Sequence, residues 1–319
     1  MAGTRKTAVA VVLAALALTA TACNDNNDDS KKAAPAAPTT AAAQPTTAAA
    51  PTPTATPTPT TPSAPAKLTP ALFLEQVTQK TSAAKSAKVD ETIAIGEVTM
   101  KGKGAVSWAD GLQGEITMDL SGSPLAKLLS VVTGGNSAPY RYTKDSMYLR
   151  MGGDAVDTFG GRHWLHYSKA DIAKASGGGT DQLKNADPVQ GVRTLIASGK
   201  VTEVGQETVG GKTATHYSGE LTANDIAKAS GKGLSQDELD KIKDNLDTAG
   251  ITSEQLDVWV DANQLVVKRT EQADTKAGTL KATVTYSDYG TPVTTTAPDP
   301  SDTVELAELA KLDKGGATS

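Results

Sequence analysis

The residue with the clearest chemistry is Cys23, the only cysteine in the 319-residue chain. Arg5 and Lys6 precede a short apolar run, and the small residues at 20–22, Ala-Thr-Ala, lead into this cysteine. A charged start, an apolar core and small residues before a cleavage point are typical of an export signal. We therefore predict that residues 1–22 are removed and that Cys23 carries a diacylglycerol. This lipid would anchor the chain at the extracytoplasmic face of the cell membrane.

An ordinary signal peptide is the alternative for the same stretch. Cleavage would then follow the Ala-Thr-Ala sequence at 20–22 and leave Cys23 as a free thiol. Such a thiol would have no disulfide partner, because the chain contains no second cysteine. Lipidation explains a lone cysteine at this position better. In either case the exported domain must be held together by its hydrophobic core alone.

Two other patterns resemble a phosphate-binding loop and a metal site, but each lacks a feature that such a site requires. Residues 206–213, Gln-Glu-Thr-Val-Gly-Gly-Lys-Thr, lack the first glycine of a phosphate-binding loop, and a strand is expected after the lysine where that loop needs a helix. His163 and His166 have a His-x-x-His spacing, but residues three apart in a strand face opposite sides and cannot share a metal. The sequence therefore predicts no metal site and no cofactor.

Acidic side chains outnumber basic ones in this chain. Removal of Arg5 and Lys6 with the signal leaves 29 basic and 36 acidic residues, a net charge of −7. This balance argues against binding to nucleic acid or to anionic lipid headgroups. No carboxylate pair sits in an obviously apolar setting, and no Gly-x-Ser-x-Gly nucleophile elbow occurs. We therefore predict no catalytic residues and expect that the chain is not an enzyme.

Composition divides the rest of the chain into three parts. Residues 33–66 contain no charged residue and nine of the sixteen prolines, which favours extended polyproline II over a packed core. We predict an Ala/Pro/Thr-rich stalk over residues 23–66, a folded domain over residues 67–299 and a C-terminal tail over residues 300–319.

Helix and strand signals in the folded domain are local and closely spaced. Thr69 and Pro70 suit the N-cap and first turn of a helix that should end near Ala84. From Val89 on, apolar residues alternate with polar ones, and the connections are too short for crossovers, so we expect antiparallel hairpins. Strands are predicted at residues 89–95, 98–100, 106–108, 116–120, 140–142, 147–151, 164–166, 201–217 with a turn at 210–211, 256–260, 265–270 and 280–286. A turn is predicted at residues 101–104, and helices at residues 124–132, 187–197 and 235–246, the last with a capping box of Ser235 and Glu238.

An internal echo links two parts of the domain. His-Tyr-Ser at 166–168, followed by Asp-Ile-Ala-Lys-Ala-Ser-Gly from 171, recurs as His-Tyr-Ser at 216–218, followed by the same seven residues from 225. In both copies a strand end leads into a short helix that a glycine would stop. Because two copies are too few for a solenoid, they predict two similar strand-to-helix corners in one domain.

Methionine is concentrated in the first half of the domain. Apart from the initiator, Met100, Met118, Met147 and Met151 all lie in predicted strands with aromatic residues nearby. Flexible thioether side chains suit a cavity that adapts to an irregular apolar ligand. An ordinary core that uses methionine as filler is the alternative, and it stays open at this point.

Several short segments resemble actinobacterial lipoproteins of the LppX/LprG and LolA/LolB-like group. They are Tyr-Leu-Arg-Met at 148–151, the tryptophan strand at Trp164, the stretch at 204–217, Val-Trp-Val-Asp at 258–261 and Ser-Asp-Tyr-Gly-Thr-Pro-Val at 287–293. The resemblance implies an α+β fold: a strongly curved antiparallel sheet, or half-barrel, whose concave side is covered by several short helices. It also implies that the concave side binds a lipid or an acylated molecule.

These observations combine into one leading prediction and two rivals. The leading prediction is a membrane-anchored lipoprotein that binds or carries a hydrophobic ligand in the cell envelope. The first rival is an envelope interaction or sensor module with a filled core and a protein partner, and the second is an enzyme with a polar cleft. The residues predicted to line the ligand site are Ile93, Ile95, Met100, Trp108, Ile116, Met118, Leu120, Leu128, Leu129, Tyr142, Met147 and Trp164.

Overall fold

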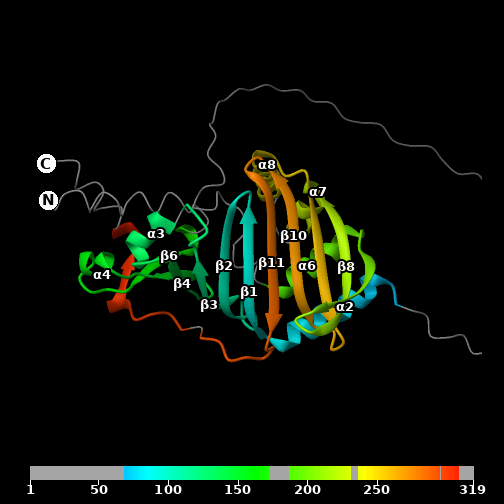
Figure 1. Cartoon of the computed structure of the whole chain (residues 1–319), viewed down its shortest axis with the longest axis horizontal. Helices are drawn as coiled ribbons and strands as arrows, with labels where there is room; N and C mark the ends of the chain where they lie inside the picture. Colours follow the sequence, from blue (N-terminus) through cyan, green and yellow to red (C-terminus); the bar gives the residue numbers. More distant parts are fainter. Residues whose placement is uncertain (1–67, 125, 172–186, 231–235, 295, 309–319) are drawn as a thin grey trace, which may run out of the picture. The chain divides into compact units, whose positions relative to one another are not determined.

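The computed structural model describes residues 68–124, 126–171, 187–230, 236–294 and 296–308, which form one open β-sheet with helices packed on it (Figure 1). The strands are β1 (Ser86–Ile95), β2 (Val98–Ser107), β3 (Gln113–Asp119), β4 (Ser137–Tyr142), β5 (Ser146–Arg150), β6 (Trp164–Ser168), β7 (Thr202–Val209), β8 (Lys212–Thr222), β9 (Ser253–Asp261), β10 (Val266–Thr275), β11 (Gly278–Ser287) and β12 (Thr303–Glu305). The helices are α2 (Pro70–Ala84), α3 (Ala126–Thr133), α4 (Asp154–Thr158), α6 (Pro188–Ser198), α7 (Ala223–Ser230), α8 (Gln236–Ala249) and the 3-10 helix η3 (Pro300–Asp302).

The described strands form a single sheet in the order β12-β6-β5-β4-β3-β2-β1-β11-β10-β9-β8-β7. Each pair is antiparallel except the pair of β12 and β6, which is parallel. Strand β1 pairs with β2 on one side and β11 on the other, so it joins two runs of consecutive hairpins. The curved sheet stays open between its edge strands β12 and β7. This confirms the predicted α+β half-barrel with short helices.

The first helix shows how locally determined the start of the domain is. The Thr69 side chain accepts a hydrogen bond from the Leu72 backbone N–H, and Pro70 occupies the first helical position. Lys85 then adopts φ 66° and ends the helix after Ala84. Both ends of α2 lie where the sequence predicted them, because caps depend on neighbours three or four residues away.

The turn predicted at residues 101–104 is wrong. These residues lie within β2, which runs unbroken from Val98 to Ser107. A Cβ atom on Gly102 would lie 2.5 Å from Glu91 Oε1, and one on Gly104 would lie 1.9 Å from the Glu115 carbonyl oxygen. The glycines are therefore required by the close approach of neighbouring groups across the curved sheet and not by a turn.

The face of the sheet that the helices cover, here called the inner face, holds a first core beneath α2 and α6. Leu74 and Val77 of α2 and Val192 and Leu195 of α6 are fully buried against it. The buried residues of the first core are Leu74, Val77, Ala87, Val89, Val106, Ile116, Val192, Leu195, Tyr217, Leu221, Leu256, Val258, Val260, Val266, Val284 and Tyr286. Figure 1 shows α2 crossing the lower ends of the strands as drawn.

A second core lies beneath α3 and α4, on strands β4, β5, β6 and β12. Its buried residues are Leu120, Ala126, Leu129, Val132, Ala138, Tyr140, Leu149, Met151, Ala155, Phe159, Leu165, Tyr167 and Val304. Met118 and Tyr142 contact both cores and connect them. Strand β12 was not predicted from the sequence, and it adds Val304 to this core at the sheet edge.

None of the described helices has the length and apolar character needed to cross a bilayer. The predicted signal, Cys23, the stalk and the capping residue Ser235 lie outside the described residues, so these expectations stay predictions.

Candidate ligand-binding face

The structure divides the twelve predicted ligand-site residues into four groups. Ile116 is buried in the first core, and Leu120 and Leu129 are buried in the second. Trp108, Met100, Met118, Tyr142 and Met147 are partly buried and pack against one or both cores. Ile93 and Ile95 are half-buried and belong to neither core. Trp164 lies on the opposite, outer face, with the Arg141 guanidinium 4.8 Å from its ring, and the side chain of Leu128 lies outside the described part of the chain.

Strand register brings further apolar residues beside Ile93 and Ile95. Ile93 lies opposite Met100 of β2 and Ala282 of β11. Ile95 lies one row further along the strands, opposite Val98 and Leu280. All six of these residues are half-buried. We call this set, Ile93, Ile95, Val98, Met100, Leu280 and Ala282, the apolar patch.

A charged group lies next to the apolar patch on the same inner face. Arg269 of β10 is only 2 % exposed, and its Nε lies 3.2 Å from Glu271 Oε1. Helix α6 can cover this arginine because its Gly191 has no side chain, since a Cβ there would lie 2.6 Å from Arg269 Cδ. Burial lowers the pKa of Arg269, but the surrounding carboxylates outweigh this effect and keep it charged.

Three further carboxylates act electrostatically on Arg269. Burial and the nearby Glu271 carboxylate raise the pKa of Glu254 to about 8, although Arg269 opposes this shift. Burial also raises the pKa values of Glu91 and Asp187, against the influence of Arg269. The expectation that no carboxylate pair sits in an apolar setting is therefore wrong for Glu254 and Glu271. We call Glu91, Asp187, Glu254, Arg269, Glu271 and Tyr286 the charged cluster.

Tyr286 adds an unpartnered hydroxyl to the charged cluster. Its side chain is 4 % exposed, and its hydroxyl is the buried side-chain group without a hydrogen-bond partner among the described residues. Burial raises the pKa of Tyr286, and Arg269, Glu271, Asp187 and Glu91 all act on it electrostatically. A buried hydroxyl without a partner costs stability, so the unpartnered Tyr286 hydroxyl is not explained by packing alone.

Sequence reasoning missed the charged cluster, although one signal for it was present. Glu91 falls between Val89 and Ile93 in the strand alternation, and Glu271 falls between Arg269 and Ala273. Alternation alone places these charges on the apolar face. Their convergence depends on the pairing of β1, β11, β10 and β9, which the sequence does not reveal.

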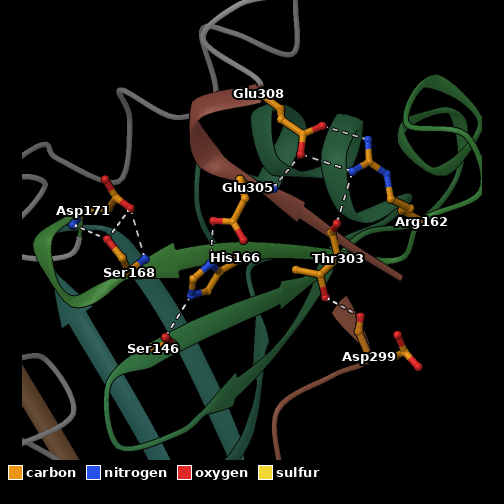
Figure 2. Close-up of polar contacts among 9 residues, drawn as sticks. All are labelled: Ser146, Arg162, His166, Ser168, Asp171, Asp299, Thr303, Glu305 and Glu308. Carbon is orange, nitrogen blue, oxygen red and sulfur yellow. Dashed lines mark hydrogen bonds and ion pairs between the residues drawn. The ribbon is translucent and has the colours of Figure 1, made fainter. Parts of the chain in front are cut away.

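The outer face carries a different set of polar contacts at the β12 edge (Figure 2). His166 Nδ1 lies 2.7 Å from Glu305 Oε2, and its Nε2 lies 2.8 Å from Ser146 Oγ. Arg162 donates to both carboxylate oxygens of Glu308 and to the Thr303 carbonyl oxygen. These contacts connect the C-terminal residues to strands β5 and β6. They tie β12 to the sheet edge.

His163 and His166 contact different carboxylates. His163 Nδ1 contacts Asp302 at 2.7 Å, whereas His166 contacts Glu305. Among the described residues, no group of three or more His, Cys, Asp or Glu side chains could hold a metal ion. An open pocket of about 570 Å³ lies beside His163, Arg150 and Asp157, and none of the twelve predicted ligand-site residues lines it.

The internal echo corresponds to two similar corners. Ser168 Oγ donates to Asp171 Oδ2 at 2.6 Å, and Thr222 Oγ1 donates to Asp225 Oδ2 at 2.7 Å. In each corner the aspartate backbone N–H also donates to the hydroxyl, so the strand end caps the turn that follows. The prediction of two strand-to-helix corners is confirmed as far as the structure describes these corners.

The outward histidine of the second echo copy, His216, lies between two carboxylates, whereas His166 lies between a carboxylate and a serine hydroxyl. His216 Nδ1 and Nε2 lie 2.9 Å from Glu207 Oε1 and Asp257 Oδ1, and its ring stacks on Trp259 at 4.3 Å. Lys268 Nζ lies 3.9 Å from the centre of the Trp259 ring. This outer-face network joins strands β7, β8, β9 and β10.

Two Streptomyces proteins are similar to this chain over most of its length. An uncharacterized 31.2 kDa protein of Streptomyces griseus, from the rplA-rplJ intergenic region, is 43% identical over 258 residues, which cover 79% of this chain and 84% of that protein. A protein of Streptomyces coelicolor, named as a candidate lipoprotein, is 33% identical over 252 residues, 77% of this chain and 79% of its own. No family model matches the chain.

Two solved structures of mycobacterial proteins, one of them a lipoprotein, are more distantly similar. LppX of Mycobacterium tuberculosis is 14% identical, with 72% of this chain and all of LppX covered and a TM-score of 0.41. LprF of Mycobacterium bovis is 16% identical, with 70% and 96% covered and a TM-score of 0.40. LppX gives its name to the group that the sequence resembles. The fold itself is established by the chain's own open sheet and helices.

Proposed function

Because this chain belongs to the family of these two Streptomyces proteins, one of them named as a candidate lipoprotein, we propose that it is an exported, lipid-anchored protein that binds a hydrophobic ligand on its inner face. Cys23 is the proposed lipidation site, and the stalk at residues 23–66 would place the domain away from the membrane. The ligand is held by burial of apolar surface without chemistry.

The observation that carries this proposal is the apolar patch. Strand alternation places Ile93 and Ile95 on the inner face with the buried Val89, yet neither belongs to a core. Each methylene that a ligand buries there contributes about 0.8 kcal/mol, so an acyl chain of moderate length suffices for micromolar binding. Met100 at one side of the patch supplies a side chain that adapts to different ligand shapes.

Native mass spectrometry tests ligand binding directly. The chain from residue 23 on, with Cys23→Ser so that it carries no lipid of its own, is expressed in a lipid-containing host and purified without detergent. We expect a bound lipid, recovered by organic extraction, or uptake of a fluorescent fatty-acyl probe. Ile93→Asn should weaken uptake at least about tenfold, because it places an amide in the apolar patch. Val204→Asn, at a valine that is 58 % exposed on β7, is the matched control and should bind like the parent.

Metabolic labelling tests the anchor independently. The full chain should incorporate a labelled fatty acid and remain with the membrane fraction, and Cys23→Ser should abolish both. Labelling that persists in Cys23→Ser would refute the proposed lipidation site and leave ligand binding untouched.

An interaction module with a filled core is the second candidate, and the two packed cores favour it. In that case the purified protein contains no extractable lipid and takes up no acyl probe. A protein partner would then be found by cross-linking from the intact cell envelope.

A further inference from the structure

From the charged cluster beside the apolar patch we infer that the inner face selects amphiphiles with a cationic, ammonium-type head group. This inference rests on the proposed function, since the apolar patch would hold the chain of the same ligand. The apolar patch alone does not determine the head group of the ligand, and this inference specifies its chemical class.

The first argument is the charge that a ligand would meet. The cluster contains four carboxyl groups, of Glu91, Asp187, Glu254 and Glu271, and one guanidinium, of Arg269. The guanidinium is buried beneath α6 and engages Glu271, whereas Glu271 itself is 24 % exposed and Glu91 and Glu254 are half-buried. A head group that approaches from the apolar patch therefore meets carboxylates. It does not meet the arginine that an anionic head group would need.

The second argument is the unpartnered Tyr286 hydroxyl. It is buried within the electrostatic reach of Arg269, Glu271 and Glu91, and its oxygen can accept a hydrogen bond from an ammonium N–H. An ammonium group has three such donors, so a bond to the tyrosine leaves two donors for other acceptors.

The third argument is position. Glu91 lies two residues from Ile93 on the same face of β1, and Glu254 lies in the same row of the sheet as Leu280 and Ile95, through Ala273. Neighbouring strands lie about 5 Å apart, so Glu254 on β9 is about 10 Å from Leu280 on β11 and about 15 Å from Ile95 on β1. A head group at Glu91 therefore lies directly beside the apolar patch, and one at Glu254 reaches the patch along its row through Ala273.

Calorimetric titration with three ligands of equal chain length tests the inference. Dodecylammonium, dodecanol and dodecanoate are titrated at pH 9, above the pKa of about 8 at which Glu254 ionises, into the chain from residue 23 on with Cys23→Ser. We expect dodecylammonium to bind at least about tenfold more tightly than dodecanol, which is the value of one hydrogen bond to a charged group. Dodecanoate should bind most weakly.

Three variants separate the head-group site from the apolar patch. Glu254→Gln and Glu91→Gln should each weaken dodecylammonium about tenfold and leave dodecanol unchanged, whereas Glu220→Gln, at an exposed position on the outer face of β8, should change neither. Tyr286→Phe should weaken dodecylammonium and at the same time raise the melting temperature of the free protein, because it removes an unsatisfied hydroxyl. A purely structural tyrosine would not give this pair of opposite effects.

The outcomes distinguish the two proposals. Equal affinity for the three ligands, or tightest binding of dodecanoate, overturns the head-group inference and keeps the proposed function. Binding of none of the three overturns both. Weaker dodecylammonium binding in Glu220→Gln as well would show that overall negative charge, and not the charged cluster, attracts the cation.

Discussion

The lower and upper rows of the inner face are built from the same strands, yet they differ in how they are filled. In the lower rows Val89, Val258 and Val260 are almost completely buried against α2 and α6. In the upper rows Ile93, Ile95 and Leu280 on β1 and β11 are half-buried, whereas Leu256 and Leu221, in the same rows on β9 and β8, are buried. The lower rows account for the stability of the domain, and the upper rows retain apolar surface and charge that stability alone does not require.

This difference indicates which part of a half-barrel can bind a ligand. A filled core and a binding surface can occupy the same sheet face when the covering helix reaches only part of the strands. Burying several ionisable groups is costly for a fold, so their presence at the boundary between the two regions indicates a role beyond packing.

Removal of Arg269, the one cation in the charged cluster, should destabilise the region where the lower and upper rows meet. Arg269→Met leaves the neighbouring carboxylates buried without a counter-charge, and we expect a loss of about 3–5 kcal/mol in the free energy of unfolding. Urea denaturation measures this loss, with Arg193→Met, on the exposed side of α6, expected to change stability by less than about 0.5 kcal/mol. A loss below about 1 kcal/mol in Arg269→Met would mean that the cluster is not held by the arginine.

Truncation of one side chain in the first core and one in the apolar patch should reduce stability by different amounts. Leu74→Ala, at a fully buried position of the first core, should cost about 2–5 kcal/mol. Ile93→Ala in the apolar patch should cost about 1 kcal/mol, because less of that side chain is removed from water. Thermal unfolding compares the two, and Leu72→Ala, 49 % exposed on the same helix, is the control with almost no effect. Equal losses at Leu74 and Ile93 would show that the patch is ordinary core.

The pH dependence of stability should report on Glu254. The folded-state pKa of Glu254, about 8, exceeds the ordinary value of 4.5, so between these values the folded protein holds a proton that the unfolded chain has released. Stability should therefore fall as pH rises from about 4.5 to 8, by at most about 1.4 kcal/mol per pH unit from this group. Glu254→Gln should flatten this slope, and Glu220→Gln should preserve it. An unchanged slope in Glu254→Gln would show that another group titrates.

The smallest effect is expected on the outer face, at the sheet edge. Glu305→Gln weakens the contact with His166, and because Glu305 is 58 % exposed the loss in stability should stay below about 1 kcal/mol. Amide exchange at Val304 should nevertheless become severalfold faster, since β12 is short and lies at the edge. Unaltered exchange would show that the histidine contact does not hold the strand.

Local features of this fold could be predicted from the sequence, and contacts between distant residues could not. The ends of α2 follow from Thr69 and Pro70, and the hairpin turns follow from glycines and Asp-containing pairs. The error at residues 101–104 arose because Gly102 and Gly104 look like turn residues. Glycine is needed at these two positions because Glu91 and the β3 backbone approach them closely. This approach can be seen only once the strands are paired.

The candidate site was predictable in part for the same reason. Alternation alone places Ile93 and Ile95 on one face, which is why they were chosen. Leu120 and Leu129 share the same apolar character, but both are buried in the second core, Leu129 as part of α3. Arg269 and Glu91 are separated by 178 positions in the chain and meet through the pairing of β1 with β11 and of β11 with β10.

The parallel pairing of β12 with β6 has a consequence for the order in which the domain is completed. Strand β6 is synthesised 139 positions before its partner, since Trp164 pairs with Thr303. Until the last part of the chain emerges, the outer hydrogen-bonding groups of β6 remain an open template for strands of other molecules. Truncation before Thr303, which removes β12, would therefore favour self-association of nascent chains far more than the small contribution of this strand to the final free energy suggests.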